Sequence, residues 1–178
     1  MKYYVVADVH GFCSRLKDAL KEKGFFNDEE PHKLIVCGDL FDRGSEAVEL
    51  QNFILELLEK DEAILIKGNH EELLVDMLNS WHRASYLESH HNSNGTVDTV
   101  LQLTGSRLAD LYDNPSDVYY KMKETPFMQK ILRAMVDYFE TESHIFVHGW
   151  IPCESIRQNP YAVTYFAIDD WRNASAKQ

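Results

Sequence analysis

Two carboxylates and an arginine stand together in residues 38–44, which read GDLFDRG. Asp39 and Asp42 lie three residues apart, and Arg43 follows directly. The stretch comes after an apolar run that is typical of a buried strand. A loop at the carboxyl end of a strand is where an open α/β sheet binds its ligand, so acids and a cation there indicate a functional site.

Similar polar residues follow three further apolar runs. In chain order, they are Asp8 and His10, Asn69 and His70, and His148. Carboxylate, imidazole and amide donors together suit borderline divalent metals such as manganese, iron and zinc better than calcium or magnesium. Two ions held roughly 3.5–4 Å apart are the usual arrangement for hydrolysing phosphate esters, and an arginine beside them can bind phosphate through paired hydrogen bonds. The residue types therefore predict a two-metal phosphate site.

These side chains meet only if the apolar runs form neighbouring strands. The patterns predict strands at residues 3–7, 32–37, 63–66 and 144–147, and helices over 13–23 and 47–60. Alternation of strand and helix over the first 66 residues indicates a βαβαβ unit with parallel strands. Since parallel strands end at the same edge of the sheet, the polar loops should lie side by side.

Residues 72–140 show no convincing strand, and we expect them to form a helical insert over one edge of the site. Helices are predicted over 96–103 and 126–139, with a weaker one over 115–123. The polar segment 85–95 is expected to be a solvated loop, although His90 and His91 within it could reach the site. The whole chain, residues 1–178, is interpreted as a single domain.

Composition narrows the class of protein. The net charge of −11 disfavours binding to nucleic acid or to an anionic membrane. Three cysteines, an odd number without metal-site spacing, favour free thiols in a reducing compartment. Because no apolar run approaches membrane-spanning length and no signal-peptide pattern opens the chain, a cytoplasmic location is expected.

The four polar blocks resemble the signature blocks of a known family. Residues 8–11 (DVHG), 38–44 (GDLFDRG), 68–71 (GNHE) and 148–149 (HG) are similar, in the same order, to those of the calcineurin-like metallophosphoesterases. The nearest branch is the serine/threonine phosphoprotein phosphatases with their bacterial and phage relatives. The resemblance implies a four-layer α/β fold, in which two packed sheets are flanked by helices.

The resemblance also implies a metal-ligand set. Asp8, His10 and Asp39 would hold the first metal ion, and Asp39 would bridge to a second ion held by Asn69 and His148. Two divalent ions are implied, manganese foremost, with iron, zinc or nickel as alternatives. The family has a further histidine ligand in a Gly-His context that is absent from this sequence, so we expect the chain to lack its C-terminal part.

Catalytic roles follow from the same resemblance. A metal-bridging hydroxide would attack phosphorus, His70 would be the general acid, and Asp42 would orient it. Arg43, Asn69 and Arg172 would bind the substrate phosphate. For each Asp or Asn taken singly, a turn or helix-capping role is the simpler interpretation; the joint pattern favours the site.

The expected function is hydrolysis of phosphomonoesters, with phosphoserine or phosphothreonine proteins as substrates and a small phosphoester as the other possibility. One alternative is hydrolysis of dinucleoside polyphosphates or nucleotide phosphodiesters. Glu71 favours the protein phosphatases, because the dinucleoside hydrolases tend to have aspartate at this position. Another is a non-catalytic fragment that binds phosphate or a partner protein. The sequence leaves the oligomeric state open.

Overall fold

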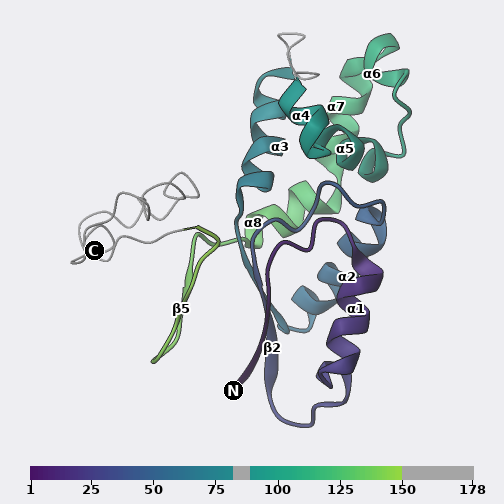
Figure 1. Cartoon of the computed structure of the whole chain (residues 1–178). Helices are drawn as coiled ribbons and strands as arrows, with labels where there is room; N and C mark the ends of the chain where they lie inside the picture. Colours follow the sequence, from purple (N-terminus) through teal and green to yellow (C-terminus); the bar gives the residue numbers. More distant parts are fainter. Residues whose placement is uncertain (82–88, 150–178) are drawn as a thin grey trace, which may run out of the picture.

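The computed structural model describes residues 1–81 and 89–149. Its elements in chain order are β1 (Lys2–Val6), α1 (Cys13–Glu22), η1 (Phe25–Asn27), β2 (His32–Cys37), α2 (Ala47–Glu59), β3 (Ala63–Ile66), α3 (Asn69–Asn79), α4 (Ser89–Asn94), α5 (Thr96–Thr104), α6 (Asp110–Asp113), α7 (Pro115–Glu124), η3 (Phe127–Ile131), α8 (Leu132–Ala134), β4 (Phe139–Glu140) and β5 (Ile145–Phe146). The fold is mixed α/β with two sheets (Figure 1).

The first sheet confirms the predicted βαβαβ unit. Its order is β1-β2-β3, and both pairs are parallel. The last four residues of the central strand β2, residues 34–37, are apolar and buried, which suits a strand covered on both faces. The carboxyl ends of all three strands therefore open toward one end of the molecule, where α3 and the following helices lie (Figure 1).

The two faces of this sheet bury different cores. On one face, Leu34 and Val36 pack in the main cluster with apolar residues of α1 and α2, such as Leu20 and Ile54. The amphipathic pattern of these helices supplies that face, as the sequence predicted. One face of the sheet is thus sealed by helices.

The opposite face packs against the second sheet. Ile35, Cys37 and Ile66 form a smaller core with Phe139 and Phe146 of the β4–β5 hairpin. This arrangement confirms the expected α/β class with two packed sheets and flanking helices. Within residues 1–81 and 89–149, no helix is both long and apolar enough to cross a bilayer.

Two expectations about the middle of the chain are wrong. The segment expected to be a solvated loop contains α4, in which His91 is almost fully buried. The helix expected over 126–139 is a π-helical turn, η3, followed by the single turn α8, and the chain then becomes extended. There Val136 pairs with the edge of β3, since its N–H donates to Leu65 O at 2.9 Å and its carbonyl accepts from Lys67 N–H at 2.9 Å. Pairing with an exposed strand edge has overridden local helical preference.

The strand expected before His148 also differs from its prediction. It is β5, which pairs antiparallel with β4 rather than joining the parallel sheet. No strand was expected within residues 72–140, yet β4 spans Phe139–Glu140. A short turn at residues 141–144 joins the strands, with Thr141 N–H donating to His144 O at 2.8 Å. His148 consequently reaches the site from a hairpin.

Candidate metal centre

The loops that follow β1 and β2 are joined backbone to backbone. His10 N–H donates to Asp39 O at 2.9 Å, and Gly11 N–H donates to Leu40 O at 2.9 Å. Parallel pairing therefore continues beyond the strands and holds the first two polar loops together. The third loop enters α3 directly, so that Asn69 and His70 occupy its first turn. The expected convergence of three strand ends is present.

Asp39 lies at the centre of the cluster and is 4% exposed. Its Oδ2 is 3.8 Å from His10 Nε2, whereas its Oδ1 is 3.4 Å from His148 Nε2. The two carboxylate oxygens thus face different imidazoles. The backbone N–H of His70 donates to Oδ1 at 3.0 Å, which fixes the orientation of the carboxylate. One carboxylate shared between two histidines is the arrangement that can bridge a pair of metal ions.

The two histidines present the same ring nitrogen to Asp39. His10 Nδ1 lies 3.0 Å from Phe41 O, and His148 Nδ1 lies 2.9 Å from Cys37 O. Because a carbonyl can only accept, each Nδ1 carries a proton, and in the neutral ring Nε2 keeps its lone pair. Metal-binding histidines are oriented in this way. Both rings are therefore set up as Nε2 ligands.

Asn69 completes one side of the cluster. Its Oδ1 lies 2.9 Å from His148 Nε2. When the His148 ring is neutral, its Nε2 and Asn69 Oδ1 are both acceptors, so their lone pairs repel each other. A cation bound by both atoms would remove this repulsion. Asp8 lies on the other side, with Oδ1 4.0 Å from His10 Nε2. The structure brings together all five residues for which metal-ligand roles were expected, and their donor types fit a pair of borderline divalent ions.

His70 and Asp42 form a buried pair beside this cluster. His70 Nδ1 donates to Asp42 Oδ2 at 2.8 Å, and both side chains are at most 3% exposed. Burial of the ring opposes its positive charge, but the hydrogen bond to Asp42 and the negative charges of Asp39 and Asp42 outweigh it. The pKa of His70 therefore lies above its ordinary value. Arg43 Nη2 lies 3.1 Å from His70 Nε2, so the guanidinium is close to this ring nitrogen.

Two threonines of the insert hold Asp42, and the sequence analysis missed them. Thr96 Oγ1 donates to Asp42 Oδ2 and Thr99 Oγ1 to Oδ1, each at 2.7 Å. The backbone N–H of Asp42 donates to Thr99 Oγ1 at 3.0 Å. Both threonines are fully buried and lie on the same face of α5 as Val97 and Val100. The sequence contained one signal for this contact, namely two hydroxyls three residues apart on an apolar helix face. Because buried hydroxyls need hydrogen-bond partners, this pattern indicates that they bond to another buried polar group.

Glu71 has a structural role that its sequence position concealed. Its carboxylate is 2% exposed and accepts hydrogen bonds from the backbone N–H groups of Gly68, Leu40 and Asp39, at 2.8, 2.9 and 3.1 Å. Burial raises the pKa of Glu71, against the effect of these hydrogen bonds. Glu71 therefore joins the second and third loops.

Backbone strain is concentrated at the centre. Of the six non-glycine residues with positive φ in the described part of the chain, five have φ of 51–71° and carry the predicted site side chains: Asp8, His10, Asp39, Asp42 and Arg43. Each such residue costs about 1–3 kcal/mol and persists only where the surroundings enforce it. Hydrogen-bonded loops and Glu71 supply that enforcement here.

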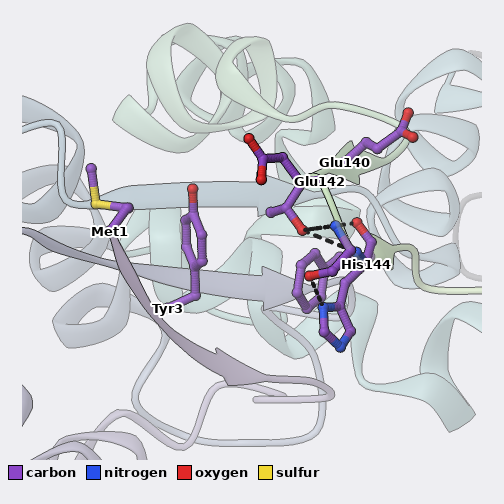
Figure 2. Close-up of a pocket in the computed structure, with 8 residues that line it drawn as sticks. Met1, Tyr3, Glu140, Glu142 and His144 are labelled. Atoms are coloured by element: carbon purple, nitrogen blue, oxygen red, sulfur yellow. Dashed lines mark hydrogen bonds between the residues drawn. The ribbon is translucent and has the colours of Figure 1, made fainter.

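A large pocket lies elsewhere. It encloses about 830 Å³ between β1 and the β4–β5 hairpin, where Tyr3, Glu140, Glu142 and His144 line it (Figure 2). None of its lining residues belongs to the metal cluster. The candidate site is therefore defined by its donor atoms rather than by cavity size. Arg172, expected to bind phosphate, lies outside the described residues.

Comparisons with known proteins agree with this geometry. A family model described as calcineurin-like phosphoesterase matches residues 1–175. The symmetrical bis(5'-nucleosyl)-tetraphosphatase of Buchnera aphidicola is 35% identical over 75 residues, which are 42% of this chain and 26% of that protein. Serine/threonine-protein phosphatase 1 of Salmonella typhimurium is 36% identical over 73 residues, which are 41% of this chain and 31% of that protein.

A solved structure shares the fold. A cold-active protein tyrosine phosphatase superposes with a TM-score of 0.54 at 22% identity, over 89% of this chain and 46% of that one. The matches span between about a quarter and a third of the two curated relatives.

Proposed function

The chain belongs to the calcineurin-like phosphoesterase family, and from this premise we propose that it hydrolyses phosphomonoesters with two divalent metal ions. The observation that carries the proposal is the orientation of Asp39, whose two oxygens face His10 Nε2 and His148 Nε2 separately. Both imidazoles are held for metal binding by hydrogen bonds from Nδ1 to backbone carbonyls.

The ligands divide into two sets that share Asp39. Asp8 and His10 would hold one ion with it, and Asn69 and His148 would hold the other. Manganese is the metal we propose, because the mixed oxygen and nitrogen donors suit it. When bound, the ions would supply Lewis acidity and a nucleophile derived from water at neutral pH.

The chain's own residues bind the phosphate and move the proton. Arg43 would hold phosphate oxygens, with Asn69 beside it and Arg172 as a further proposed contact. His70 would donate a proton from Nε2 to the departing alkoxide, while its Nδ1 stays bonded to Asp42. Arg43 Nη2 lies 3.1 Å from that Nε2, so the phosphate clamp and the proton donor converge on one substrate position.

We propose phosphoserine and phosphothreonine in proteins as the substrates. An alkoxide is a strongly basic leaving group and needs a proton, which the buried His70–Asp42 pair is arranged to supply. The Salmonella relative is named as a serine/threonine-protein phosphatase. The proposed substrate class is therefore supported both by the chemistry of the leaving group and by similarity to this relative.

A dinucleoside polyphosphate is the second candidate, because the Buchnera relative is named as a bis(5'-nucleosyl)-tetraphosphatase. Its leaving group is a nucleotide phosphate, which is a stable anion and needs less help from a general acid. Proton donation by His70 is therefore the property that separates the two candidates.

The test compares substrates and leaving groups with manganese-loaded protein. We expect kcat/KM for a phosphoserine peptide to exceed that for diadenosine tetraphosphate. In His70→Asn, we expect kcat for the peptide to fall by about 10²–10⁴-fold, with a much smaller loss for nitrophenyl phosphate, whose leaving group needs little protonation.

His144→Asn is the matched control, since His144 is exposed on the β4–β5 turn. Faster turnover of the tetraphosphate would favour the second candidate. Equal losses in His70→Asn for both leaving groups would contradict the general-acid role, and no turnover of any substrate would favour a non-catalytic binding fragment.

A further inference from the structure

Three metal-binding side chains lie together outside the centre described above. Asp76 belongs to α3, and His90 and His91 belong to α4. One ligand atom from each lies within 4.8 Å of the other two. We propose that these residues bind one transition-metal ion that links α3 to α4.

The spacing suits an ion better than a direct hydrogen bond. His91 Nε2 and Asp76 Oδ2 are 3.7 Å apart. An N–H···O hydrogen bond has a range of about 2.7–3.2 Å, so this pair is too far apart for one. Two ligand atoms about 2.05 Å from a tetrahedral ion lie roughly 3.3 Å apart, which is close to the observed separation.

The cluster combines one fixed ligand with two adjustable ones. His91 is 1% exposed, so packing holds its ring in place. Asp76 has a side chain that is 67% exposed, and His90 is also exposed. The rings of His90 and His91 lie 4.0 Å apart at 42°. The two exposed side chains can therefore rotate to close the remaining distance around an ion.

The donor set indicates which ions would bind. Two imidazoles and one carboxylate suit zinc, nickel, cobalt or copper rather than calcium or magnesium. Three protein ligands would leave one tetrahedral position for water. The net charge of −11 also favours cation binding over anion binding. No residue is shared with the centre around Asp39.

The position of the cluster gives it a structural consequence. α3 begins with Asn69 and His70, while α4 leads through Gly95 into α5, whose threonines hold Asp42. An ion between α3 and α4 would join the helix that carries His70 to the segment whose threonines hold Asp42. Since such an ion binds only the folded chain, it would raise stability as its concentration rises.

The test counts zinc in metal-stripped protein after equilibrium dialysis. We expect the unmodified chain to bind one more zinc ion than Asp76→Asn or His90→Ala. Both substitutions are at exposed side chains, so the variants should fold. His144→Ala, another exposed histidine, should bind as much zinc as the unmodified chain.

Thermal unfolding gives a second measurement, independent of phosphatase activity. Zinc should raise the midpoint more in the unmodified chain and in His144→Ala than in either cluster variant. His91→Gln tests the buried ligand and should behave as the other two cluster variants. Equal zinc content and equal thermal shifts in all these proteins would overturn the proposal.

Discussion

Asp42 shows how a single buried carboxylate is held in one orientation by hydrogen bonds. It is 1% exposed, and its two oxygens accept from His70, Thr96 and Thr99. The orientation of His70 therefore depends, through Asp42, on two threonines that lie 54 and 57 residues from Asp42 in the sequence.

Thr99→Val tests this dependence. Loss of the hydroxyl leaves Asp42 Oδ1 with one donor fewer, which should lower the free energy of unfolding by about 1–3 kcal/mol. We expect kcat for a phosphoserine peptide to fall by roughly tenfold with little change in KM, because the substitution disturbs the proposed proton donor, His70, rather than the proposed phosphate ligand, Arg43. Steady-state kinetics and urea unfolding provide the measurements.

Thr104→Val is the control on the same helix, since its hydroxyl bonds to Val100 O and does not contact Asp42. Thr99→Ser should restore most of the lost turnover. If the Thr99 and Thr104 variants kept the same kcat, Thr99 would have no positioning role.

At the scale of elements, α5 is the part of the insert that contacts the site. Gly95 precedes it and Gly105 follows it, both in the left-handed region with φ of 83° and 64°. They differ in surroundings. A Cβ at Gly95 would collide with the backbone N of Arg43, whereas a Cβ at Gly105 would have nothing within 4 Å. The start of α5 thus lies directly against the loop that carries Arg43.

Substitution of the two glycines separates the cost of the left-handed backbone conformation from the cost of the close contact with Arg43. Gly105→Ala should cost about 1–2 kcal/mol for the left-handed conformation alone. Gly95→Ala should cost more and should also lower kcat/KM, because the Arg43 backbone must move to admit the methyl group. Urea unfolding and turnover of the phosphopeptide check both. Similar turnover in the two variants would show that the close approach has no catalytic consequence.

At the scale of the molecule, one ionic contact ties the first strand to the loop before β2. Asp28 Oδ2 accepts from Lys2 Nζ and from Tyr4 OH, each at 2.6 Å. These bonds, the one from Lys2 foremost, hold the pKa of Asp28 well below its usual range. A carboxylate whose pKa is depressed by folding stabilises the folded chain above its unfolded pKa of about 4, and this contribution is lost as pH falls toward the folded value.

Asp28→Asn therefore should remove part of the acid sensitivity of the protein. We expect its free energy of unfolding to fall less than that of the unmodified chain as pH decreases below about 4. Tyr4→Phe removes one of the two bonds and so depresses the pKa of Asp28 less; the loss of stability should still begin at about pH 4, but it should be smaller and end at a higher pH than in the unmodified chain. Urea unfolding over a pH series is the measurement; parallel pH profiles for all three proteins would refute the assignment.

Local pattern alone determined much of this protein. The apolar runs and amphipathic helices predicted β1 to β3 with α1 and α2, because side-chain periodicity encodes which face is buried. Since parallel strands end at one edge, the same pattern also predicted that Asp8, Asp39 and Asn69 would meet. That residues 1–178 form a single domain stays a prediction.

Only the tertiary structure decided which distant segments meet. An antiparallel hairpin, not a parallel strand, delivers His148, and α5 delivers Thr96 and Thr99 to Asp42. α4 replaced an expected loop and set His91 beside Asp76. Periodicity records that a side chain is buried but not which partner it meets, because that choice depends on pairing between residues far apart in the chain.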